Sequence, residues 1–146
     1  MNQSSSNVKI SKKLDAEALR LVKLEENCSA NLVVHLVKIL TKRVHLEMGF
    51  NSLVEYCTNR LQLSLGQSRF RCYLANLCTR FPQALELLAK GKLSITVLGK
   101  LAAHLNSRNS AKMLRECVGM SRLQVQDYVA EFKKQIVAKT PAKEEA

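Results

Sequence analysis

The sequence contains few of the residues that build tight turns, and it has no tryptophan. Its 146 residues include five glycines and two prolines, and aromatic residues make up 5% of the chain. An all-β chain needs many tight turns, so this composition excludes an all-β fold. A hydrophobic fraction of 47% gives one ordinary domain enough apolar side chains for a core, which excludes a disordered chain. We therefore expect an all-α domain.

Long apolar runs are also missing. The longest apolar cluster, Leu32 to Leu40, is interrupted by His35 and Lys38, whereas a helix needs roughly 20 apolar residues to cross a bilayer. Residues 1–7 are polar and lack the apolar stretch of a secretory signal. These absences predict a cytoplasmic protein that does not bind a membrane.

The motifs of catalysis are not found either. There is no glycine-rich phosphate loop, no nucleophile elbow and no pair of inward carboxylates, and neither Cys57 nor Cys72 has a base partner. His35, His45 and His104 fall in separate predicted helices, and none is followed by the acid or second histidine of a metal motif. We expect no enzyme active site, no metal and no other cofactor.

The five cysteines are odd in number, and none stands in a C-x-x-C pair or near a histidine at zinc-ligand spacing. Each lies among apolar residues in a helical pattern, where a free cysteine behaves as a small apolar side chain. We therefore expect reduced core thiols and a reducing compartment. The five positions are Cys28, Cys57, Cys72, Cys78 and Cys117.

Apolar residues recur at helical spacing and predict a compact domain of about eight helices over residues 14–137. A flexible N-terminus over 1–13 and a flexible tail over 138–146 flank it. The first four helices are predicted from about 14 to 26, from Ser29 until the pattern fades near Met48, from a cap at Asn51 or Ser52 through Leu61, and from a cap at Ser64 through Cys78. The other four run from Pro82 to Gly91, from Ser94 through Leu105, from Asn106 or Ser107 through Val118, and from Ser121 through Phe132.

The basic residues are concentrated in the middle of the chain. Lysine and arginine number 23 against 12 acids, for a formal charge of +11. Between Tyr56 and Arg115, ten basic residues stand against one acid, Glu86, so +9 of that charge belongs to this segment. Such an excess is typical of a nucleic-acid footprint. The alternative is a basic surface kept for solubility or for an acidic protein partner.

The segment from Ser52 to Thr79 could form a helix-turn-helix whose second helix enters the major groove. In that arrangement the base-reading residues are Gln67, Ser68, Arg69 and Arg71, because arginine suits guanine and glutamine suits adenine. Arg60, Arg80 and Lys92 hold phosphates and set the register. The complete set of candidate nucleic-acid-binding residues is Arg60, Gln67, Arg69, Arg71, Asn76, Arg80, Lys90 and Lys92.

A second pattern on the same helix argues against groove reading. Small residues at 68, 72, 75 and 79 lie opposite the large apolar residues at 70, 74, 77 and 81. Small side chains allow another helix to approach closely, so this helix is expected to be covered on both sides. Only Arg69, Arg71, Asn76 and Arg80 would then see solvent, and they would contact phosphates rather than bases.

Short motifs follow one another in order over residues 46–129: Gly49-Phe50, Tyr56-Cys57, Leu63-Ser64, Arg80-Phe81-Pro82, Leu93-Ser94 and Ala102-Ala103-His104-Leu105. This ordered set resembles the helical N-terminal region of a group of bacterial HNH endonucleases. The resemblance implies an all-helical module that normally precedes a separate metal-dependent nuclease domain and engages nucleic acid. No histidine follows His104, so the metal-binding nuclease motif cannot be built in the remaining residues.

Two functions follow as hypotheses. The first is a non-catalytic nucleic-acid-binding module, with DNA as the partner, that acts alone or beside a nuclease encoded elsewhere. The alternative is a protein-interaction module without nucleic-acid contact, either a partner or inhibitor of a nuclease or a homodimerising domain. This alternative is based on the apolar stripe from Leu32 to Val44, which would form an exposed patch if it were not part of the core. A third hypothesis is a nuclease remnant without function.

Overall fold

Helices account for all the regular secondary structure over residues 2–139, which the computed structural model describes. The all-α prediction is therefore confirmed, and the described residues contain no strand. The first elements are α1 (Asn2–Thr41), α2 (Val44–Glu47), α3 (Leu53–Glu55), the π-helix η1 (Tyr56–Arg60) and α4 (Leu65–Arg80). They are followed by α5 (Pro82–Ala89), α6 (Ile95–Leu101), the 3-10 turn η2 (Ala102–His104), α7 (Ser110–Cys117) and α8 (Arg122–Lys139).

Helix α1 is a single element of 40 residues. It joins the first two predicted helices, so the predicted break at Ser29 is wrong, and it includes from Asn2 onward the segment predicted as a flexible N-terminus. No glycine or proline occurs between residues 2 and 41. A continuous helix keeps all the backbone hydrogen bonds around Ser29. A break at this point would lose several of them, and a single serine cap would restore only one. Most of the predicted C-terminal tail, from 140 onward, lies outside the described residues.

The end of α1 comes earlier than the sequence pattern indicates. The helix ends at Thr41, and Arg43 takes a left-handed conformation with φ 56°. No glycine or proline marks this position, although a left-handed residue other than glycine costs about 1–2 kcal/mol. The turn folds α2 back against α1 and buries His45. Gly49, where the sequence pattern placed the helix end, also has a positive φ of 92° and ends α2 instead.

Four serines begin helices where the sequence places them. The hydroxyls of Ser52, Ser64, Ser94 and Ser121 each accept a hydrogen bond from the backbone N–H three residues later, at 3.0–3.2 Å. Each bond satisfies one of the free N–H groups at a helix start. The start of α7 differs from the prediction, because the side chain of Asn106 closes the preceding turn instead.

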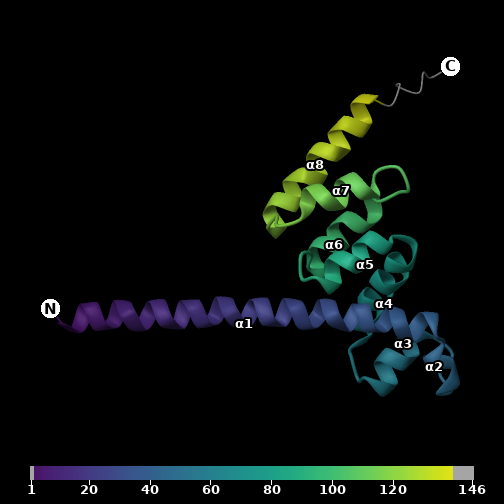
Figure 1. Cartoon of the computed structure of the whole chain (residues 1–146), viewed down its shortest axis with the longest axis horizontal. Coiled ribbons are helices and arrows are strands. Elements are labelled where there is room, and N and C mark those ends of the chain that lie inside the picture. The colour runs from purple at the N-terminus through teal and green to yellow at the C-terminus, as the bar shows by residue number, and fades with distance from the viewer. Residues whose placement is uncertain (1, 140–146) are drawn as a thin grey trace.

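The second half of α1 crosses the body of the molecule (Figure 1). Helices α2 and α3 lie on one side of it and α5 to α8 on the other, while α4 packs directly across it. Val33 and Leu36 of α1 are completely buried in the common core. The stripe from Leu32 to Val44 therefore belongs largely to the core and does not form the exposed patch on which the protein-interaction alternative was based.

Candidate nucleic-acid interface

Helix α4 is held in place at its start by two reciprocal hydrogen bonds. The Ser64 hydroxyl accepts from the Gln67 N–H at 3.1 Å, and the Gln67 side-chain oxygen accepts from the Ser64 N–H at 3.4 Å. This capping box satisfies two backbone donors that would otherwise have no partner. Gln67 therefore has a structural role that accounts for its presence, and it lies away from the arginine row described below.

Two sides of α4 are covered, as the two residue patterns predict. The small side chains of Ser68, Cys72 and Ala75 are buried on one side, and Leu74 and Leu77 are buried on the other. Thr79, the last residue of the small stripe, is exposed. A helix covered in this way cannot lie in a major groove, and the helix-turn-helix is not confirmed.

Packing against α6 is especially close. A Cβ atom built on Gly99 of α6 would stand 2.8 Å from two ring carbons of Phe70 of α4. Real Cβ contacts are not that short, so the Phe70 ring occupies the space that only a glycine leaves free. Together with the packing of α4 against α1, α3 and α5, this contact determines which residues of α4 face solvent.

One narrow strip of α4 remains exposed. It carries Arg69, Tyr73, Asn76 and Arg80, which are spaced at i, i+4, i+7 and i+11 and share one face. We call these four residues the α4 flank. Tyr73 is 47% exposed, and it is not among the candidate residues named from the sequence. Its helical spacing from the two arginines is the signal that could have placed it with them.

The two arginines of the flank are not neutralised by acids. Among the described residues, the salt bridges join Arg20 to Glu17, Lys90 to Glu86 and Lys112 to Glu116, so neither flank arginine takes part in one. The Arg80 guanidinium lies 5.6 Å from the centre of the Phe81 ring. That cation–π contact orients the side chain without removing its charge.

The remaining candidates lie elsewhere. Arg71 is half-buried on another side of α4, with its Nη1 3.5 Å from the Gln67 carbonyl and its Nε buried without a partner. Lys90 forms an ion pair of 2.7 Å with Glu86. Arg60 and Lys92 are exposed, at the end of η1 and in the turn before α6. The structure thus places three of the eight candidates on one surface.

The cysteines separate into one exposed and four buried thiols. Cys28 is exposed, so the prediction that all five thiols lie in the core is wrong for this residue. The Sγ atoms of Cys57 and Cys72 lie 3.7 Å apart. Burial raises the pKa of Cys57 and raises that of Cys72 to about 12. Cys78 and Cys117 are buried as well, with the pKa of each raised to about 11 mainly by burial.

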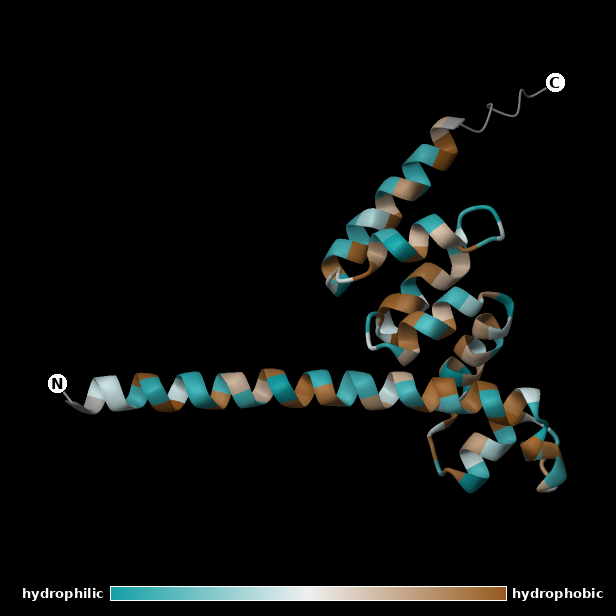
Figure 2. Cartoon of the chain, viewed as in Figure 1, coloured by the Kyte–Doolittle hydropathy of each residue, from teal (hydrophilic) through white to brown (hydrophobic). Residues whose placement is uncertain are grey.

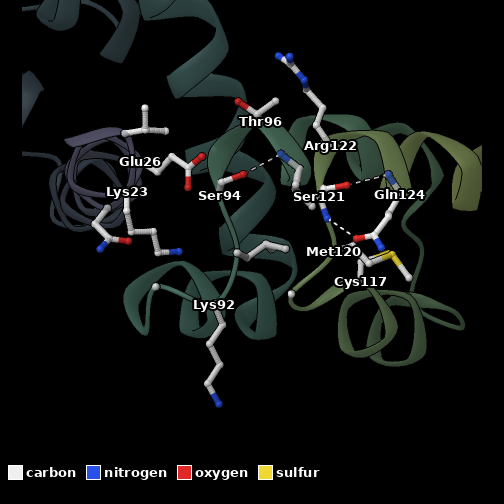
Figure 3. A pocket seen from close by; sticks show the side chains of 16 residues that line it. Lys23, Glu26, Lys92, Ser94, Thr96, Cys117, Met120, Ser121, Arg122 and Gln124 are labelled. Atoms are coloured by element: carbon white, nitrogen blue, oxygen red, sulfur yellow. Dashed lines mark hydrogen bonds between the residues drawn. The ribbon is translucent and has the colours of Figure 1, made fainter. Parts of the chain in front are cut away.

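A cavity of about 610 Å³ lies between α1, the α5–α6 turn and the α7–α8 turn (Figure 3). Ser94 and Ser121 line it, but both hydroxyls accept cap hydrogen bonds. Lys92 and Arg122 also line it, and Figure 3 shows these two side chains directed away from each other. These two cationic groups therefore do not converge on one point. Nor does any group of three or more potential metal ligands occur among residues 2–139.

No protein-family model, curated protein or solved structure matches the chain. Within the described part of the chain, no helix combines the length and the hydropathy needed to cross a membrane.

Proposed function

We propose that this chain is a non-catalytic DNA-binding module that holds phosphates through the α4 flank. The observation that carries the proposal is the pair Arg69 and Arg80, both exposed and outside the described salt bridges, on a helix whose other sides are covered. The +9 charge of the central segment supports it. So does the resemblance to the helical region that precedes HNH nuclease domains.

The geometry of the flank favours backbone contact. Arg69 and Arg80 are eleven residues apart, about 16 Å along the helix axis, which equals the rise of about five base pairs. Each guanidinium can hold one phosphate oxygen pair, and together they set the orientation of α4 against the strand. Binding of this type is independent of base sequence.

Tyr73 lies between the two arginines and adds a flat apolar surface. An exposed aromatic ring beside arginines offers a stacking surface for an unpaired base, which is worth about 1–3 kcal/mol per base. Asn76 adds a polar group on the same face, although its Nδ2 already donates to the Cys72 carbonyl at 2.9 Å. The flank therefore suits a single strand or a frayed duplex end in addition to duplex phosphates.

The test is binding to a fluorescent duplex, a single strand and an RNA hairpin between about 50 and about 300 mM salt, where counterion release dominates the affinity. We expect the affinity to fall steeply with salt. The double substitution Arg69→Ala/Arg80→Ala should reduce the slope of log affinity against log salt by about 2. Tyr73→Ala should weaken binding to the single strand more than to the duplex.

The matched control is Arg115→Ala/Arg122→Ala, which removes the same charge from exposed positions on α7 and α8. An equal loss in both double variants would contradict the assignment to α4. A flat salt response in the unchanged protein would contradict nucleic-acid binding itself.

A further inference from the structure

Two of the four buried thiols form a pair that nucleic-acid binding does not use. The Sγ atoms of Cys57 in η1 and Cys72 in α4 lie 3.7 Å apart, and either thiol can donate a weak hydrogen bond to the other. Cys57 is 0% exposed and Cys72 is 4% exposed. Among the described residues, which include all five cysteines, this is the one contact between two sulfur atoms.

The pair lies in the common core. Both thiols belong to the same buried cluster as Val33 and Leu36 of α1, and Figure 2 shows hydrophobic bands along the half of α1 that crosses the body. Brief local opening of such a site admits a molecule about as small as water and keeps bulky thiol reagents out. Any reagent for this pair must therefore be very small.

The backbone on both sides of the pair is held by hydrogen bonds. The Cys57 carbonyl accepts a hydrogen bond from the Leu63 N–H at 3.0 Å. Gln62, between them, has a left-handed φ of 58°, which is unfavourable for a residue other than glycine. The Cys72 carbonyl accepts a hydrogen bond from the Asn76 side-chain amide at 2.9 Å. A tight, strained turn thus holds Cys57 against α4.

The two sulfur atoms are close enough to be joined by small movements. Bonded sulfur atoms stand about 2.05 Å apart, so the pair must close by roughly 1.7 Å from its present 3.7 Å. Cysteine side chains are short and unbranched, and rotation about their Cα–Cβ bonds moves the sulfur atoms without displacing either helix. The bond would connect residues fifteen positions apart and close a short loop.

The surroundings of the two thiols decide which one reacts first. Burial raises the pKa of Cys57, whereas its hydrogen bond with Cys72 and the positive charge of Arg71 lower it. Burial and the neighbouring Cys57 both raise the pKa of Cys72, to about 12. The thiolate is the nucleophilic form of cysteine. Cys57 is therefore the thiol that attacks first, with Arg71 as a residue that favours its ionised form.

We propose that Cys57 and Cys72 are a peroxide-sensitive site, at which a small hydroperoxide such as hydrogen peroxide produces a reversible disulfide bond within the chain. The Cys57 thiolate attacks one peroxide oxygen, and the O–O bond breaks. The other oxygen leaves as hydroxide, takes up the proton that Cys57 released and becomes water. Cys57 is then a sulfenic acid.

The second step joins the two residues. The Cys72 sulfur attacks the Cys57 sulfur, the S–O bond breaks, and the hydroxyl group leaves as water with the Cys72 proton. The two thiols together lose two electrons, and the peroxide is reduced to two molecules of water. The bond ties η1 to α4 and leaves the side chains of the α4 flank unmodified, so the proposal does not rest on nucleic-acid binding.

The first test is mass spectrometry of the full chain carrying Cys28→Ser, which removes the exposed thiol. After incubation with excess hydrogen peroxide under native conditions, we expect the mass of a monomer that has lost two hydrogen atoms. Peptide fragmentation should place the bond between Cys57 and Cys72, and a dithiol reductant should remove it. Adding Cys57→Ala or Cys72→Ala should abolish the bond. Adding Cys78→Ala, which removes an equally buried thiol from the same helix, is the matched control and should leave bond formation unchanged.

The second test concerns the order of attack. With Cys72→Ala the peroxide should add oxygen at Cys57, and with Cys57→Ala it should add little at Cys72. Arg71→Met should slow bond formation several-fold and move its pH profile to higher pH, since the charge that favours the thiolate is lost. Arg71→Lys should largely preserve both. Arg69→Met, which removes an equal charge from the exposed face of the same helix, should change neither.

The third test is thermal unfolding of the oxidised and reduced chains. The oxidised chain should unfold at a temperature higher by on the order of 5–10 °C, because the bond restricts the unfolded chain. Oxygen adducts without a bond, a bond to Cys78 or Cys117, or a bond that forms only in denaturant would each overturn the proposal. A lower unfolding temperature after oxidation would also overturn it, because the bond would then not fit the native fold.

Discussion

At the scale of single residues, Gln67 illustrates how one side chain can suit two roles. In sequence it stands two residues before Arg69 at the start of a basic helix, which suits a base-reading glutamine. In the structure its side-chain oxygen accepts the Ser64 N–H and completes a capping box. A side chain held in that way is not available for a base edge.

We therefore predict that Gln67→Ala changes stability and leaves nucleic-acid affinity unaltered. Loss of its half of the box should lower the free energy of unfolding by about 0.5 kcal/mol, and Ser64→Ala should lower it by about 1 kcal/mol. Denaturant titration and the binding assay measure the two properties on the same samples. A tenfold loss of affinity at unchanged stability would return Gln67 to the base-reading role.

The thiols give a second prediction at this scale. Burial raises the pKa of Cys57, Cys72, Cys78 and Cys117, and a thiol with a raised pKa holds little reactive thiolate at neutral pH. In the native protein an aromatic disulfide reagent should therefore label Cys28 rapidly and the other four slowly. All five should react at once in guanidinium chloride. Rapid native labelling of a second thiol, identified by mass spectrometry, would contradict the burial.

At the scale of helices, the contact between α4 and α6 decides which residue fits at position 99. The Phe70 ring fills the space beside Gly99. Because Gly99 is in an ordinary helical conformation, helix propensity alone would favour alanine there. The close approach of the Phe70 ring makes glycine the better residue at this position.

We predict opposite signs for the same substitution at two glycines. Gly99→Ala should destabilise the protein by about 1–2 kcal/mol, since the added methyl forces the half-buried Phe70 to move. Gly66→Ala, in the first turn of α4 with no atom near its Cβ position, should stabilise it by about 0.5 kcal/mol. Thermal unfolding of the two variants measures the difference. Equal effects would show that the α4–α6 contact is looser than the structure has it.

At the scale of the whole molecule, α1 has two halves with different environments. From Ala30 onward it is a core helix, and residues 4–26 contribute nothing to the core. Folding of the rest of the molecule should therefore be independent of residues 4–26.

We predict that a chain beginning at Val22 unfolds at nearly the same temperature as the full chain when both are dilute. Leu36→Ala, in the buried half, should cost about 3 kcal/mol because it leaves a cavity in the core. Scanning calorimetry at low protein concentration compares the three proteins. If the unfolding temperature of the shortened chain fell by several degrees, the residues before Val22 would be shown to stabilise the rest of the molecule.

Much of the helical framework could be predicted from the sequence because its signals are local. The serines at 52, 64, 94 and 121 each bond to a backbone group three residues away, and Pro82 begins α5 where its missing N–H costs nothing. The small residues of α4 predicted its covering correctly, because side-chain size limits how closely helices approach. None of these signals depends on distant parts of the chain.

The sequence by itself therefore determined the all-α class, most helix starts and the basic centre of the chain. Only the tertiary structure decided that α1 runs unbroken past Ser29, that it ends at Thr41 rather than near Gly49, and that Tyr73 is exposed beside Arg69 and Arg80. Caps and periodicity act within one or two turns of a helix. Burial is set by which helices meet, and α4 packs against α1 and α6, which are far from it in sequence. These contacts, with that of Phe70 and Gly99 among them, leave one face of α4 to solvent.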